Sequence, residues 1–123
     1  MIYENENTEI SISGVNTEIG LSLYGDDMEL YVDVLRSYVL NTPAVLDRIR
    51  EVSEETLKDY AINVHGIKSI SANIGAEETR KAALNLETMA KAGDFSGVLA
   101  QNYNFIKDTE KILANVKTWL EQF

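Results

Sequence analysis

A long helical repeat near the C-terminus constrains the fold of this chain more than any other feature. Over residues 95–120, apolar side chains recur every three or four positions for about seven turns, and no glycine or proline follows Gly97. The stripe that they form must be buried against other elements, because an amphipathic helix gains most of its stability from packing. Asp94 precedes the repeat as a predicted N-cap. Asn102 and Thr109 interrupt the stripe, and we expect both to hydrogen-bond to neighbouring groups, since unpaired burial is costly.

The preceding residues predict a series of shorter helices. The expected segments cover residues 16–23, 26–41, 43–52, 54–74 and 76–92. Asp26, with Glu29 three residues later, resembles a capping box at the start of the second segment. Thr42 followed by Pro43 predicts a new helix, with threonine as the N-cap and proline at the first helical position.

The loops between these predicted helices are so short that consecutive helices must lie next to each other. Gly75 and Gly93 predict left-handed terminators, and helices joined by short loops pack antiparallel. Residues 10–13 alternate as a strand does, but no partner strand can be assembled from the rest of the chain. We therefore predict an all-α fold, an antiparallel up-down-up-down four-helix bundle over residues 10–123 with short N-terminal helices packed against it. Residues 1–9 are predicted to be a flexible polar tail or a linker remnant.

Composition excludes several classes of protein. Acidic residues number 20 against 11 basic ones, so the net charge of −9 repels phosphate backbones and argues against a nucleic-acid partner. The chain has no cysteine, which excludes a disulfide framework and favours a reducing, cytoplasmic location. No apolar run approaches the ~20 residues of a transmembrane helix, so no membrane association is expected. We expect a monomer of one domain.

The only histidine lies on the shoulder of a predicted helix. Val64, Ile67 and Ile74 mark the apolar face of that helix, and His65 lies about 100° around from Val64. Lys68 follows one turn later, with its Cβ about 5–6 Å from that of His65. The spacing therefore predicts an accessible imidazole beside an ammonium group.

This pair has the chemistry of a phosphoryl carrier. A free imidazole titrates near pH 6.5 and is a nucleophile when neutral, and a lysine can partly neutralise an attached phosphoryl group. Small side chains at Ser69 and Ala72 leave room for a partner to approach. Spacing alone favours a simpler explanation, a surface histidine beside a solvated lysine.

The order of several motifs adds a family resemblance that covers residues 10–121. The sequence His65-Gly66-Ile67-Lys68, the run Ser71-Ala72-Asn73-Ile74-Gly75-Ala76 and the later Leu86-Glu87 resemble the signature of histidine-containing phosphotransfer (HPt) domains. The upstream Ile12-Ser13-Gly14-Val15-Asn16, Gly20-Leu21, Tyr24-Gly25, and Tyr31 with Leu35 resemble the family's entry segment. Two positions depart from the family pattern: Ser69 replaces a usual glycine, and Thr79 replaces a usual leucine.

The resemblance implies a role for each matching residue. His65 would accept a phosphoryl group from a receiver-domain aspartate and pass it to another receiver, and Lys68 would stabilise the phosphorylated state. Ile62, Ser69 and Ala72 would contact the partner. The chain would be a phosphocarrier and not an enzyme, with no cofactor or metal site of its own, because the receiver supplies Mg²⁺ and the catalytic groups.

Two other functions remain open. The chain could be the phosphoacceptor domain of a chemotaxis-type histidine kinase, or a helical adaptor that binds receivers without being phosphorylated. A sensor histidine kinase is a further candidate partner, and the chain could be free-standing or a module of a hybrid kinase. Other chemistries lack their residues: a di-iron bundle needs Glu-x-x-His pairs, whereas Ile62 stands three residues before His65, and no P-loop or zinc-ligand set is present.

Overall fold

The computed structural model describes residues 11–123, and the regular structure within this range is helical. The elements are α1 (Thr17–Ser22), α2 (Met28–Ile49), the short 3-10 helix η2 (Glu54–Thr56), α3 (Leu57–Ile74), α4 (Glu77–Lys91) and α5 (Phe95–Leu120). The predicted all-α class is confirmed. In the predicted lead-in, Val15 donates to the carbonyl of Ile12 in an isolated bridge. The predicted tail, residues 1–9, lies outside the described range.

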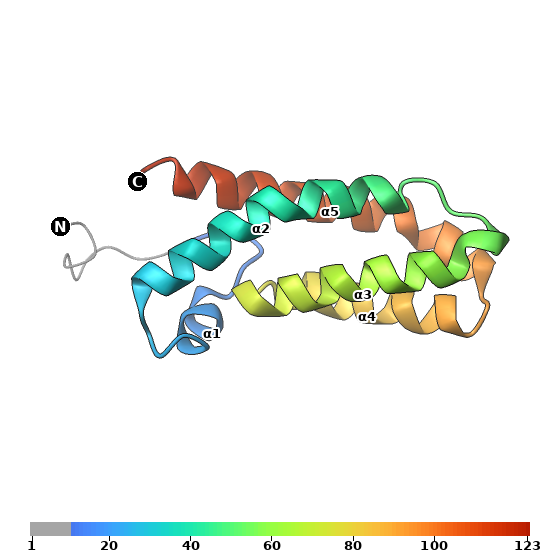
Figure 1. Ribbon diagram of the computed structural model, residues 1–123, viewed down its shortest axis with the longest axis horizontal. Helices are drawn as coiled ribbons and strands as arrows, with labels where there is room; N and C mark the ends of the chain where they lie inside the picture. The colour runs from blue at the N-terminus through green and yellow to red at the C-terminus, as the bar shows by residue number, and fades with distance from the viewer. Residues whose placement is uncertain (1–10) are drawn as a thin grey trace.

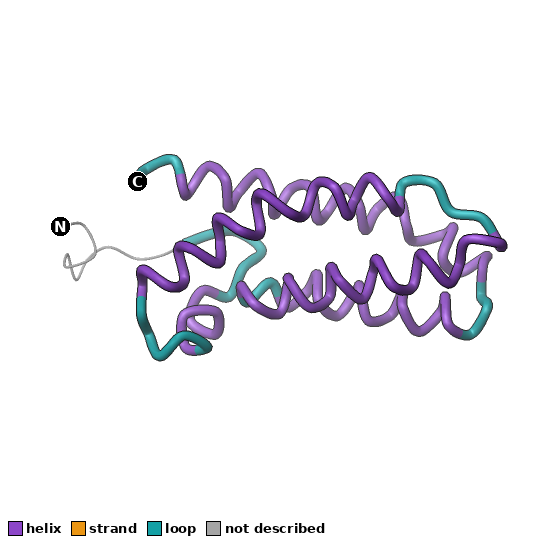
Figure 2. The backbone as a smooth tube through the Cα atoms, viewed as in Figure 1, coloured by secondary structure: helices purple, strands orange, loops and turns teal. Residues whose placement is uncertain are grey.

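The four longer helices lie side by side, and the loops gather at their ends (Figures 1 and 2). Helix α3 packs against α2 and α4, and α5 packs against the same two helices. The short helix α1 packs against α2 and α3 near the end of α3. Each long helix therefore turns its apolar stripe toward two neighbours at once.

Buried side chains fix the middle of α3 on both sides of the histidine. Val64 and Ile67 are fully buried and belong to a cluster that also takes residues from α2, α4 and α5. Burying a side chain of this size is worth roughly 1.5–3 kcal/mol. The backbone between Val64 and Ile67, which carries His65, is therefore held firmly in place.

The predicted polar breaks in the stripe of α5 do find partners. Asn102 accepts a hydrogen bond from the Tyr60 hydroxyl at 2.8 Å and donates to the carbonyl of Ile49 at 2.7 Å. Thr109 donates to the carbonyl of Phe105, one turn earlier in α5, at 2.8 Å. Asn102 thus joins α5 to α3 and to the end of α2, which satisfies its buried amide.

Two predicted boundaries near α2 are wrong. The helix does not end near Asn41, and no new helix begins at Thr42 and Pro43. Instead, α2 runs through Pro43 to Ile49. A proline inside a helix removes one hydrogen bond and crowds the preceding turn, at a cost of ~3 kcal/mol or more. Leu46 and Ile49 continue the buried stripe of α2 beyond the proline, and their burial, worth roughly 1.5–3 kcal/mol each, offsets that cost.

The start of α2 also differs by one residue from the prediction. Asp27 is the N-cap, and its carboxylate accepts from the backbone N–H of Leu30 at 3.2 Å. Asp26 instead adopts a left-handed conformation, with φ of 62°. The capping-box pattern identified the correct turn but the wrong aspartate.

The predicted C-terminal end of α3 is confirmed, whereas residues 54–56, predicted as its first turn, form the separate 3-10 helix η2. Ser53 and Thr56 form a capping box at η2, and Gly75 ends α3 with φ of 86°. The carbonyl of Gly75 accepts from the N–H of Asn16 at 2.7 Å. The hydroxyls of Tyr24 and Tyr31 donate to the last two carbonyls of α3 at 2.7 and 2.8 Å. The segment around α1 therefore satisfies backbone acceptors that a helix end leaves without partners.

Gly66, directly after His65, is expected to weaken α3. It lies inside the helix, and apart from its chain neighbours and the nearby helix backbone, a methyl group at this position would meet no atom within 4 Å. Because glycine in a helix costs roughly 0.5–1 kcal/mol relative to alanine, Gly66→Ala should raise the free energy of unfolding by about that amount. Urea denaturation measures the change.

Gly20 in α1 provides the opposite control. A methyl group there would lie 2.7 Å from the ring of Tyr31, so Gly20→Ala should lower the free energy of unfolding. A loss of stability in Gly66→Ala would contradict the open space beside His65.

Candidate functional site

His65 lies on the exposed side of α3, as predicted from the helical spacing. Its side chain is 57% exposed, although Val64 and Ile67 on either side are fully buried. The ring is therefore accessible to a partner while its backbone is fixed. This combination suits a group that must react with another molecule in one defined orientation.

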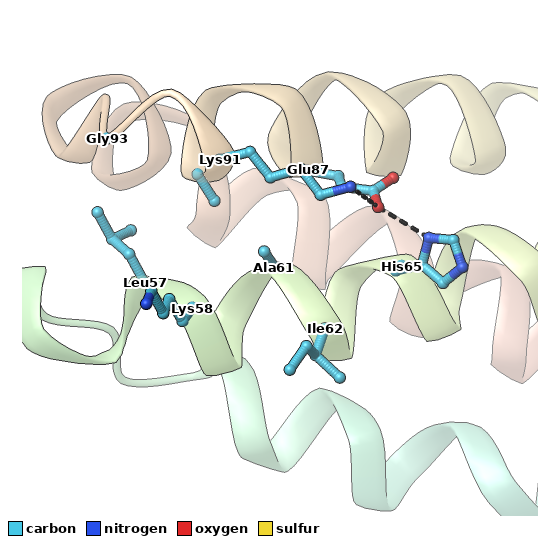
Figure 3. Close-up of a pocket in the computed structure, with 9 residues that line it drawn as sticks. Leu57, Lys58, Ala61, Ile62, His65, Glu87, Lys91 and Gly93 are labelled. Carbon is cyan, nitrogen blue, oxygen red and sulfur yellow. Dashed lines mark hydrogen bonds and ion pairs between the residues drawn. The ribbon is translucent and has the colours of Figure 1, made fainter.

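A buried carboxylate from the neighbouring helix holds the ring. Glu87 of α4 places Oε2 2.8 Å from His65 Nδ1, and its side chain is only 4% exposed. The same carboxylate accepts from Lys68 Nζ at 2.7 Å and from Lys91 Nζ at 3.1 Å. Figure 3 shows Glu87 reaching toward His65 and Lys91 extending along α4 toward the same carboxylate. The side chains of His65, Lys68 and Lys91 thus all contact the one carboxylate of Glu87.

The charge of Glu87 decides which nitrogen of His65 is reactive. Burial by itself raises the pKa of Glu87, but hydrogen bonds from Lys68, Lys91 and His65 lower it to about 2. An ionised carboxylate can only accept a hydrogen bond, so His65 Nδ1 must carry the proton. In the neutral ring, Nε2 then holds the free lone pair. Figure 3 shows this second nitrogen turned away from Glu87.

The cluster carries a local excess of positive charge. Glu87 contributes one negative charge, whereas Lys68 and Lys91 contribute two positive charges. The chain as a whole has a net charge of −9, so this spot differs in sign from the average surface. An anionic group that approached His65 would be attracted here.

The other predicted site residues lie along the same side of α3 as His65. Lys68 is close by, but its side chain is only 24% exposed and its ammonium group binds Glu87. Ile62 is 69% exposed one turn before His65, Ser69 is exposed one turn after it, and Ala72 is half-buried two turns after it. These positions form a line, and their contact with a partner stays a prediction.

Sequence reasoning gave no role to Glu87 or to Lys91. Glu87 enters the family resemblance only as part of the Leu86-Glu87 motif, yet it occupies a buried position of α4 together with Ala83, Leu86 and Ala90. A glutamate in such a stripe is rare unless a cation pairs with it. That signal predicts a partner for Glu87 but does not say which helix supplies it.

The described part of the chain shows two further negative findings. Among residues 11–123, no group of three or more histidine, cysteine, aspartate or glutamate side chains could hold a metal ion. Within the same residues, every helix is too short or too polar to cross a membrane.

Comparisons of this chain with protein-family models, with curated proteins and with solved structures found no match.

Proposed function

We propose that this chain is an HPt-like phosphoryl carrier in which His65 takes a phosphoryl group from the aspartate of one receiver domain and passes it to another. One observation carries the proposal: His65 is exposed, and the buried, ionised Glu87 holds its Nδ1–H and leaves Nε2 free to react. We further propose that the four longer helices form an up-down-up-down bundle that serves as the scaffold. A cytoplasmic location would suit partners of this kind.

The transfer uses one lone pair and needs no proton movement at the attacking nitrogen. Nε2 of His65 attacks the phosphorus atom, and the P–O bond to the aspartyl group breaks, which releases a carboxylate on the receiver. The ring then carries a positive charge with the proton still on Nδ1, directly against the carboxylate of Glu87, 2.8 Å away. Attack by the aspartate of a second receiver reverses these steps.

Charge and position are what this chain contributes to the reaction. A transferred phosphoryl group carries nearly two negative charges, which the excess positive charge at Lys68 and Lys91 can offset. Phosphoryl transfer depends mainly on positioning and charge stabilisation, so a fixed helix with one oriented imidazole is sufficient on this side. In this proposal the receiver supplies Mg²⁺ and the remaining catalytic groups.

Transfer of label tests the proposal directly. Receiver domains are phosphorylated with ³²P-labelled acetyl phosphate and Mg²⁺, separated from the reagent and mixed with this protein. We expect acid-labile, base-stable label on the protein and its passage to an unphosphorylated receiver. Labelling only by the ATP-binding domain of a chemotaxis-type kinase would favour the kinase alternative. Receiver binding without any labelling would favour the adaptor.

Lys68 should support the phosphorylated state. Lys68→Ala removes one of the two ammonium groups near the ring, so we expect slower transfer or a shorter lifetime of the phosphohistidine, by about 5- to 30-fold. Lys68→Arg should restore part of the loss, since arginine keeps the charge. Rates come from the decay of labelled protein with and without a receiver.

Lys111, an exposed lysine on α5, provides the control for this series. Lys111→Ala changes the net charge equally and should transfer at the normal rate. Equal rates and lifetimes in Lys68→Ala and Lys111→Ala would mean that Lys68 serves only to pair with Glu87.

A further inference from the structure

A groove between α3 and α4 opens directly beside His65 and extends toward the start of α3 (Figure 3). Its volume is about 700 Å³. Leu57 and Ala61 from α3 and Ala90 from α4 contribute to its apolar lining, together with the exposed Ile62. We call this surface the α3–α4 groove. It ends at His65 and Glu87, so anything seated in it would reach the reactive ring.

Two lysines give the groove a charge opposite to that of the whole chain. Lys58 from α3 and Lys91 from α4 both line it, and both are exposed. Lys58 forms no ion pair within the described residues, so its charge is available to a partner. The one carboxylate in the lining, Glu87, is buried and already bonded to Lys68 and Lys91. An apolar surface with positive side chains beside it is complementary to a partner surface that is also apolar but has negative side chains beside it.

We propose that the α3–α4 groove receives an apolar ridge flanked by carboxylates on the receiver domain that exchanges its phosphoryl group with His65. This inference rests on the function proposed above and adds where the partner lies. The sequence predicted contact at Ile62, one turn before His65, and at Ser69 and Ala72, which lie toward the end of α3. The groove extends from His65 in the other direction, and Ile62 is the residue that both surfaces share.

Charge complementarity also explains why the partner would choose this surface. A receiver that presents a phosphorylated aspartate is acidic at the point of contact, and a chain with net charge −9 repels it on average. The lysines of the groove offer local attraction beside His65, and the apolar lining offers area to bury. Binding should therefore weaken as salt is added.

In the experiment, His65 is first phosphorylated by a small molecule, a step that we call loading. A receiver domain is then tested for its ability to take the phosphoryl group away, a step that we call unloading. Phosphoramidate is the loading probe: Nε2 attacks its phosphorus, the P–N bond to the amino group breaks and ammonia leaves. The labelled protein is then mixed with a panel of isolated receiver domains and Mg²⁺. Loading reports on the imidazole alone, whereas unloading also requires docking.

Ile62→Glu and Lys58→Glu test the groove. Both side chains are exposed, so neither change should disturb folding. We expect normal loading by phosphoramidate in both variants. At receiver concentrations below saturation, unloading should slow by about tenfold or more in Ile62→Glu and severalfold in Lys58→Glu. The Lys58→Glu variant should also show a weaker dependence on salt.

Matched controls carry the same changes elsewhere. Leu40→Glu alters an exposed leucine of α2, and Lys111→Glu reverses an exposed lysine of α5. Both should load and unload as the wild-type protein does. A loss of unloading in these controls equal to that in the groove variants would overturn the proposal, because net charge alone would then explain the effect.

The remaining outcomes separate the groove from the function. If the wild-type protein loads but no receiver unloads it, the proposed relay function is wrong, and the groove assignment is lost with it. If receivers unload the wild-type protein and both groove variants equally well, the function stands and the groove is wrong. Slower unloading confined to Ser69→Leu would place the partner toward the end of α3. A wild-type dimer that Ile62→Glu dissociates would assign the groove to a second copy of the chain, and would also overturn the proposal.

Discussion

Replacing His65 by glutamine should abolish phosphorylation of this protein by receivers and by phosphoramidate alike. The chain has no other histidine, and among residues 11–123 the exposed ring of His65 is the group for which the structure shows an oriented nucleophilic nitrogen. The fold should survive, because the side chain is 57% exposed and a glutamine amide can still donate to Glu87. We expect the free energy of unfolding to change by less than about 1 kcal/mol. Acid-labile label, circular dichroism and the melting midpoint measure these effects.

Asn63→Gln, two residues earlier on α3, is the matched control and should be labelled normally. Label that persists in His65→Gln would place the phosphoacceptor on another residue and refute the central assignment. Unfolding of His65→Gln at much lower temperature would instead show that the imidazole supports the fold.

Most helix ends could be predicted because single residues determine them locally. Gly75 and Asp94 each act through hydrogen bonds or backbone angles within a few residues, so the sequence alone contains the information. Pro43 shows where this fails. Proline strongly favours a helix start by its local geometry, but Leu46 beyond it is buried against α3, α4 and α5. The stability gained from that burial outweighs the local preference, so the helix continues.

The candidate site likewise has one part that the sequence could predict and one part that it could not. His65 and Lys68 lie one turn apart on one helix, so their proximity follows from helical geometry. Glu87 is 22 residues from His65, and no helical spacing brings them together. Their contact depends on how far α4 is rotated and shifted against α3, which side-chain packing decides. Lys91 could not be predicted for the same reason, because its role depends on its ion pair with Glu87.

Glu87 should make the stability of the protein depend on pH in a predictable window. Its pKa of about 2 in the folded protein lies below the ordinary value of 4.5, so the unfolded chain binds a proton more readily between these values. The stability that Glu87 contributes is therefore fully present above about pH 4.5 and is lost as the pH falls toward 2. Glu87→Gln keeps the shape but removes the charge.

We expect Glu87→Gln to lower the free energy of unfolding by about 1.5–3 kcal/mol near pH 7, because Lys68 and Lys91 lose a charged acceptor. The difference between wild-type and variant proteins should shrink steadily below pH 4.5. Urea denaturation of both proteins from pH 2 to pH 7 measures it. Glu78→Gln provides the control on the same helix, since Glu78 is 86% exposed and pairs only with Lys81 at 3.5 Å among the described ion pairs.

The same substitution should slow phosphoryl transfer by about tenfold or more. A neutral amide can either donate to or accept from Nδ1, so Glu87→Gln no longer fixes the proton there or keeps Nε2 as the nucleophile. It also removes the negative charge that faces the positive ring once the phosphoryl group is attached. Glu78→Gln should transfer normally. A Glu87→Gln variant that loses stability but transfers at the wild-type rate would show that Glu87 only holds α4 against α3, and that the orientation of His65 has another cause.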